Sequence, residues 1–120
     1  FTCRQAELLL GKLNDTPVKE FEVDTASFAD LKALVAETIS RIEAQTDTKE
    51  SFAEAKTSLE LPSMPTLSMT GQDYIDEWLT PNFYFHLVTA YDILRAKGLA
   101  IGKADYLSHL RPLLAAAMAS

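Results

Sequence analysis

The sequence predicts an all-α fold: an up-down helical bundle with three long helices and a short extended or hairpin segment near residues 57–69. Two observations predict it. Apolar residues recur at helical spacing in three stretches, and residues that cap or end helices bound those stretches. The 120 residues are 48% hydrophobic and 23% charged, which is typical of one globular domain.

The net charge of −6 disfavours nucleic acid and anionic membranes as partners, because both repel an acidic protein and no Lys/Arg cluster offsets the charge. A helix-turn-helix DNA-binding function is the least favoured interpretation for the same reason. No apolar run approaches the roughly 20 residues of a membrane helix. The single cysteine, Cys3, cannot form an internal disulfide, so we expect a reducing compartment and a cytoplasmic protein.

The first two helices have clear ends. Pro17 ends the first helix soon after Asn14. Its apolar face is expected to consist of Cys3, Ala6, Leu9, Leu10 and Leu13, with Arg4, Glu7 and Lys12 on other faces. Ser27 and Asp30 have capping-box spacing, which predicts a second helix over Ser27–Gln45. Its core-facing stripe is expected to consist of Phe28, Leu31, Val35, Thr38, Ile39 and Ile42.

The third helical region is expected to start at Thr70 as N-cap and to restart or kink at Thr80-Pro81. From Pro81 to Lys97 the chain is apolar on nearly every side, which predicts a helix in the centre of the domain. Gly98 is expected to end it. A short helix near Pro112 is expected in the tail.

One long segment resembles a known family. The resemblance is carried by Thr80–Arg95, Lys97–Gly98 and Ile101–Leu107, with upstream support from Phe28–Leu31 and Ser68–Tyr74. These residues resemble the domain-of-unknown-function family nineteen ninety-three. That family is similar to the DinB/YfiT-like four-helix bundles, a superfamily that contains metal-dependent enzymes. The resemblance covers residues 1–107 as a bundle domain and leaves 108–120 as a tail.

The resemblance also implies a difference at the front of the chain. Family members usually carry another helix before this region, and the first residues here already have a helical pattern, so three of four long helices are expected. A missing helix would expose apolar surface on the first and third helices. We therefore expect self-association and a homodimer as the partner state.

His86 is the first candidate for chemistry. The resemblance implies a divalent metal ion held by histidines, with His86 as one ligand. The chain has only one other histidine, His109, which lies in the tail, and Ala96 stands where family members often have a histidine. The alternative is a structural histidine in the core, hydrogen-bonded to Asn82 or Thr89.

A second candidate is a helix face that carries Tyr84, Val88, Tyr91 and Arg95. Two phenols near a guanidinium would suit a pocket for a small anionic ligand, with Tyr84, Tyr91 and Arg95 as the site residues. Core packing is the alternative interpretation. Asp92 and Arg95, one turn apart, are expected to form an ion pair with each other or to reach across to a neighbouring helix.

Two functions remain open from the sequence. One is a helical-bundle protein without a complete catalytic set. The other is a DinB-like metal-dependent enzyme, of the thiol transferase or hydrolase type, that uses His86 as one metal ligand.

Overall fold

The computed structural model describes residues 1–18, 21, 26–45 and 50–119. Within this part the chain is mainly helical and contains one two-stranded sheet. It divides into two compact units, Phe1–Leu87 and Val88–Ser120. Each unit is described by itself.

The first two helices begin and end close to where their capping residues predict. Helix α1 spans Thr2–Asn14 and ends where Asp15 turns into the left-handed region, with φ 53°. Helix α2 spans Phe28–Glu43. At its start the Asp30 N–H donates to Ser27 Oγ at 3.2 Å, and the Ser27 N–H donates to Asp30 Oδ2 at 2.8 Å. The hydrogen bonds from Ser27 lower the pKa of the Asp30 carboxyl.

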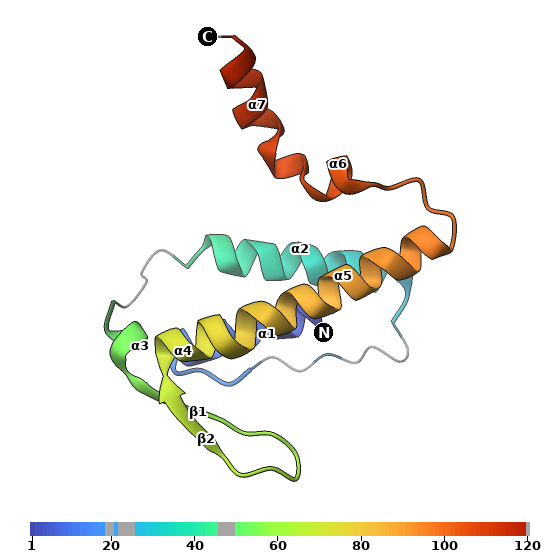
Figure 1. The fold of residues 1–120 in the computed structure, drawn as a ribbon. Helices are drawn as coiled ribbons and strands as arrows, with labels where there is room; N and C mark the ends of the chain where they lie inside the picture. The colour runs from blue at the N-terminus through green and yellow to red at the C-terminus, as the bar shows by residue number, and fades with distance from the viewer. Residues whose placement is uncertain (19–20, 22–25, 46–49, 120) are drawn as a thin grey trace. The chain divides into compact units, whose positions relative to one another are not determined.

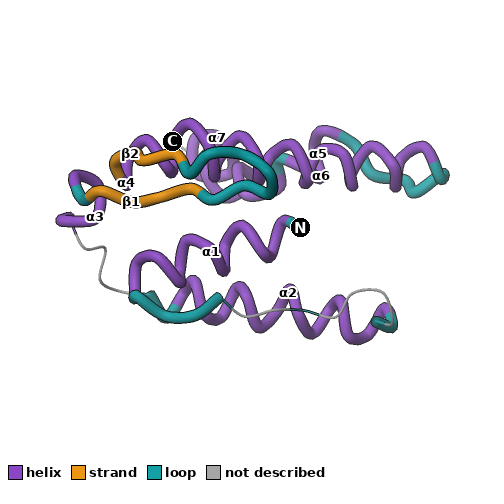
Figure 2. Tube along the Cα trace, turned by 90° about the horizontal axis from the view of Figure 1, so that it is seen from below, coloured by secondary structure: helices purple, strands orange, loops and turns teal. Residues whose placement is uncertain are grey.

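Polar side chains join α1 to α2, and the two helices lie side by side (Figures 1 and 2). Glu7 is 2% exposed, and its Oε2 lies 2.6 Å from Arg41 Nη1. Asn14 Nδ2 donates to Gln45 Oε1 at 2.9 Å. The expectation that Glu7 points away from the core was wrong, because its carboxylate is buried against α2 beside the partly exposed guanidinium of Arg41.

The apolar stripe of α2 faces solvent, which corrects the prediction that it faces the core. Only Thr38 of that stripe is buried, while Phe28 is 79% exposed and the other four members are exposed as well. The reason is the rotation of α2. Arg41 and Thr38 face α1, and at about 100° per residue the stripe centred on Val35 lies roughly a quarter turn away. No described element covers that side.

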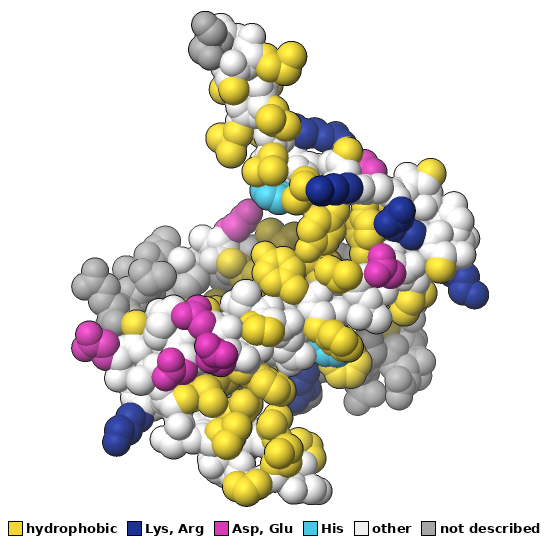
Figure 3. Space-filling model, viewed as in Figure 1, with side chains coloured by type: hydrophobic (Ala, Val, Ile, Leu, Met, Phe, Trp, Pro, Cys, Tyr) yellow, Lys and Arg dark blue, Asp and Glu magenta, His cyan; other side chains and the backbone are white. Residues whose placement is uncertain are grey.

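The predicted hairpin is confirmed. Strand β1 spans Lys56–Leu59 and strand β2 spans Leu67–Thr70, antiparallel, with Leu59 opposite Leu67. Hydrophobic side chains gather on the hairpin at the foot of the view in Figure 3. Met64 and Leu67 of this segment are exposed. The core of the first unit is small: it consists of Leu59, Tyr74 and Leu79, with Leu9, Leu61, Met69 and Trp78 packed around them.

The chain between the hairpin and the long helix makes a close approach that requires glycine. Helix α3 spans Glu50–Glu54, and the carbonyl of Ala55 accepts from the Gly71 N–H at 2.9 Å. A Cβ on Gly71 would lie 1.9 Å from the Phe52 carbonyl oxygen, so any other residue would clash with backbone.

The third helical region changes type along its length. Thr70 and Asp73 form a capping box at the start of α4 (Gly71–Asp73), as expected. A π-helical segment, η1, follows over Tyr74–Leu79 and continues into α5, Thr80–Ala96. The change coincides with Pro81, whose ring lacks the N–H that a regular helix would use. The predicted break at Thr80-Pro81 is therefore a change of helix type, with the Thr80 N–H bonded to the Ile75 carbonyl.

Helix α5 is not an interior rod, and that expectation was wrong. None of its residues is buried, and Phe85 is 66% exposed. A helix that is apolar on every side is buried only where other elements enclose it, and the described elements leave every residue of α5 at least partly exposed. Among the helices that the structure describes, none is long and apolar enough to cross a membrane.

In the second unit, Gly98 ends α5 with φ 88°. The Gly98 N–H bonds to the Arg95 carbonyl at 2.9 Å and the Leu99 N–H to the Leu94 carbonyl at 3.1 Å, which is a Schellman motif. Three short helical elements follow: α6 (Lys103–Tyr106), η2 (Ser108–Leu110) and α7 (Arg111–Met118). The predicted tail helix near Pro112 is confirmed as α7.

We predict that the Glu7–Arg41 ion pair holds α1 against α2. Arg41→Met should lower the free energy of unfolding by about 3 kcal/mol, because it leaves a buried carboxylate without its cation. In the double variant with Glu7→Gln, the loss should be smaller than the sum of the two single losses. Urea denaturation followed by circular dichroism measures all three. Purely additive losses would show that the two side chains do not interact.

We also predict that the 120-residue chain self-associates through α2, although α1 does not expose the apolar surface expected of it. The exposed stripe is symmetric about Val35, with Leu31 and Ile39 four residues away on either side, and Phe28 and Ile42 seven away. An antiparallel copy of α2 would therefore match it through one two-fold axis. A helix pair buries less than the roughly 800 Å² per partner of stable complexes, so we expect micromolar or weaker affinity.

Sedimentation velocity over a concentration series tests this association. Val35→Glu places two carboxylates together at the two-fold axis and should leave a monomer. Ala33→Glu adds the same charge to an exposed position on the opposite side of α2 and should leave the association intact. A monomeric wild-type chain at high concentration would contradict the prediction.

Candidate functional site

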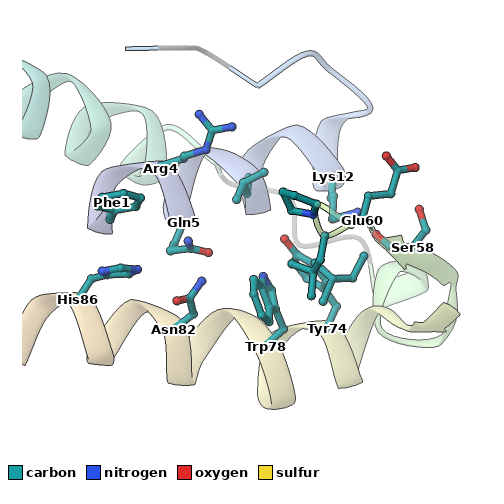
Figure 4. Close-up of a pocket in the computed structure, with 14 residues that line it drawn as sticks. Phe1, Arg4, Gln5, Lys12, Ser58, Glu60, Tyr74, Trp78, Asn82 and His86 are labelled. Carbon is teal, nitrogen blue, oxygen red and sulfur yellow. Dashed lines mark hydrogen bonds between the residues drawn. The ribbon is translucent and has the colours of Figure 1, made fainter. Parts of the chain in front are cut away.

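A cavity of about 690 Å³ lies within the first unit, between α1, the end of β1 with the turn after it, and the η1–α5 helix (Figure 4). It is lined by Phe1, Arg4, Gln5, Leu8, Lys12, Ser58, Leu59, Glu60, Leu61, Pro62, Tyr74, Trp78, Asn82 and His86. Its size is that of a site for a small molecule.

One wall consists of four side chains spaced four residues apart: Tyr74, Trp78, Asn82 and His86. In a regular α-helix, residues four apart differ in direction by about 40° around the helix axis, so the four side chains would not all face the cavity. The π-helical segment η1 has more residues per turn, so residues four apart differ there in the opposite sense, which offsets this difference. The change of helix type thus keeps all four side chains on the cavity.

Two residues of the cavity lining each have a buried polar atom without a hydrogen-bond partner in the described part of the chain: Gln5 Oε1 and Trp78 Nε1. Gln5 as a whole is 5% exposed. Figure 4 shows its amide pointing across the cavity toward Asn82. A buried acceptor and a buried donor left unpaired each cost free energy, which a bound molecule that supplies both kinds of group would recover.

The hairpin end of the cavity brings a lysine and a tyrosine together. Lys12 Nζ donates to Thr57 Oγ1 at 3.0 Å and to the Ser58 carbonyl at 2.8 Å. The same ammonium lies 4.8 Å from the centre of the Tyr74 ring. Tyr74 is 1% exposed, and this burial raises the pKa of its phenol above 10.0.

His86 lies at the other end of the cavity. Its ring stacks on Phe1 with centroids 4.6 Å apart and an interplanar angle of 12°. Phe85 meets the same ring edge-on at 5.4 Å. Among the described residues the imidazole has ring contacts and no hydrogen bond, so the expected bond to Asn82 or Thr89 is not formed. His86 instead presents a half-buried ring to the cavity.

The residues around His86 do not fit a divalent metal ion. No group of three His, Cys, Asp or Glu side chains in the described ranges is close enough to hold one. His109 lies in η2 and does not line this cavity. The amide side chains of Gln5 and Asn82 are weaker ligands for zinc or nickel than imidazole, thiolate or carboxylate. Metal binding by His86 stays a prediction of the family resemblance.

Part of the predicted anion pocket is brought together in the second unit. Val88, Tyr91 and Arg95 line a cavity of about 230 Å³ with Lys103 and Tyr106. Tyr84 belongs to the first unit, is half exposed and packs edge-on against Phe83 instead. The expected ion pair between Asp92 and Arg95 is not among the contacts of the described residues.

Sequence reasoning missed Gln5, Trp78, Lys103 and Tyr106 as site residues. The four-residue spacing from Tyr74 to His86 was a usable signal, but it points to one face only if the helix is not regular. Gln5 gave no signal, because a single polar residue beside an apolar stripe has the pattern of a surface position.

The comparisons with known proteins agree with this fold. Residues 1–107 match the model of the family described as Domain of unknown function (DUF1993). The chain belongs to this family. Among curated proteins nothing matches.

Solved structures are also similar to this member of the DUF1993 family. One of them is the crystal structure of a DinB family member protein from Shewanella denitrificans, with 29% sequence identity and a TM-score of 0.67. The match covers 88% of this chain and 60% of that protein. The chain therefore spans about three fifths of the length of its solved relative, and the likeness supports the DinB-like assignment.

The buried phenol of Tyr74 predicts a loss of stability in alkali. Because its folded pKa lies above the ordinary value, the unfolded chain releases this proton first, and the free energy of unfolding should fall as pH rises above about 10. Tyr74→Phe should reduce that fall. Urea denaturation at about pH 8 and about pH 11 measures it, with the same substitution at exposed Tyr84 as the control. An unchanged alkaline slope in Tyr74→Phe would contradict the prediction.

Proposed function

We propose that this DUF1993 chain is a binding domain that holds a small, flat polar molecule in the cavity between α1 and η1–α5. One observation carries the proposal: two residues of the cavity lining have a buried acceptor, Gln5 Oε1, and a buried donor, Trp78 Nε1, without partners in the described chain. The matching ligand supplies both a donor and an acceptor, as a primary amide does.

The surrounding side chains support a ring attached to that amide. The imidazole of His86 already stacks on one aromatic ring, Phe1, in a near-parallel arrangement. A flat ligand would find the same kind of contact beside the rings of Trp78 and His86. Aromatic carboxamides therefore combine the two features that the cavity offers.

Binding, rather than catalysis, suits the side chains that line the cavity. The lining has one carboxylate, Glu60, which is exposed, and one imidazole, His86, and no contact in the described chain pairs either with a nucleophile. The proposal places the domain in the cytoplasm, since Cys3 has no second cysteine to pair with. It also treats the helices as part of a DinB-like bundle, by likeness to the solved relative.

Tryptophan fluorescence tests the proposal directly, because Trp78 is the single tryptophan of the chain and lines the cavity. Titration with nicotinamide, a ring with a carboxamide, should change its emission and saturate. Gln5→Leu should weaken that binding about tenfold, since one buried hydrogen bond contributes roughly 1 kcal/mol. Gln72→Leu, the same substitution outside the cavity, should leave the affinity unchanged.

Two outcomes would count against a binding domain of this kind. If nicotinamide caused no saturable change in tryptophan emission, or if Gln5→Leu and Gln72→Leu weakened its binding equally, the cavity would not be a site for carboxamides. The DinB-like metal enzyme is tested on the same protein by elemental analysis for zinc, nickel and manganese. Stoichiometric metal that is lost in His86→Ala would favour the enzyme over the binding domain.

A further inference from the structure

The small cavity of the second unit has a rigid frame. Tyr91 Oη donates to the Gly102 carbonyl at 2.5 Å and so ties the end of the loop to α5. The ring of Tyr91 meets that of Tyr106 edge-on, with centroids 5.5 Å apart and an interplanar angle of 81°. The Gly102 N–H donates to Asp105 Oδ2 at 2.9 Å and starts α6. These contacts hold two aromatic rings and Val88 around one hollow of about 230 Å³.

Two cations line this hollow, one from each helix: Arg95 from α5 and Lys103 from α6. Neither side chain has an ion pair or hydrogen bond with the described residues. The nearby carboxylates do not neutralise them. Asp105 accepts from Gly102 and lies 3.5 Å from Arg111, and Asp92 does not line the hollow.

The chain as a whole carries a net charge of −6. Two cations without ion-pair partners beside an apolar hollow therefore differ from the acidic character of the chain. An anion bound between Arg95 and Lys103 would gain from both charges, and the planar guanidinium suits the two oxygens of a carboxylate. Val88 and the two tyrosine rings would cover an apolar body behind that carboxylate. A bare inorganic ion would leave these apolar contacts unused.

We propose that this hollow is a binding site for a small organic acid, with its carboxylate between Arg95 and Lys103 and its apolar body against Val88, Tyr91 and Tyr106. The site is separate from the cavity of the first unit and does not depend on the function proposed for it. Its volume suits an acid with a single ring.

Titration with benzoate, followed by amide NMR shifts of the full chain, tests the site. Benzoate should shift the amides of Gly102, Lys103 and Tyr106 and saturate at millimolar concentration. Benzyl alcohol, of similar shape and without charge, should bind at least about tenfold more weakly. Arg95→Gln and Lys103→Gln should each weaken benzoate binding about fivefold, the range of partly exposed ion pairs.

Lys97→Gln is the matched control, because Lys97 lies at the end of the same helix and does not line the hollow. It should leave the benzoate affinity unchanged, while wild-type-like spectra of all three variants confirm that they fold. Equal binding of benzyl alcohol and benzoate would overturn the proposal, as would equal weakening by Lys97→Gln. Inorganic phosphate that binds at the same amides as tightly as benzoate would overturn the assignment to organic acids.

Discussion

The ion pair between the buried Glu7 and the partly exposed Arg41 sets the orientation of α1, and the rest of the first unit depends on that orientation. A carboxylate 2% exposed is stable in its charged form only beside a cation, so the side of α1 that bears Glu7 must face α2. At 3.6 residues per turn, Gln5 and Lys12 then point to the opposite side of α1. That is the side on which the cavity lies. A stabilising contact on one side of the helix thereby places polar groups of the site on the other.

The opposite wall depends on a second constraint, the proline at position 81. A regular helix cannot use the missing N–H of Pro81, and the chain before it is π-helical from Tyr74 to Leu79. π-helical segments are rare, and they often occur at functional sites. Here the segment aligns Trp78, Asn82 and His86 on one wall. The change of helix type before Pro81 therefore accounts for both the irregular backbone and the polar side chains on this wall.

Local signals predicted the helix ends and the hairpin well, whereas burial was predicted poorly. Ser27 with Asp30, Thr70 with Asp73, and Gly98 act within a few residues of themselves, so the sequence around each one decides the outcome. Burial of the α2 stripe and of α5 depends on which elements lie against them. Periodicity identifies the apolar side of a helix but not its neighbour, and Phe28 and Phe85 are therefore exposed despite their patterns.

The sequence by itself determined the helical class, the hairpin, the family and the presence of Tyr91 and Arg95 on one helix face. All of these follow from local hydrogen bonding and residue spacing, or from a run of residues long enough to be specific. Only the tertiary structure decided that Gln5 and Trp78 line the same cavity and that Lys103 joins Arg95. Those pairs come from segments far apart in the chain or separated by a turn. Their meeting depends on the rotation of α1 and on the fold of the loop between α5 and α6, which residue spacing does not encode.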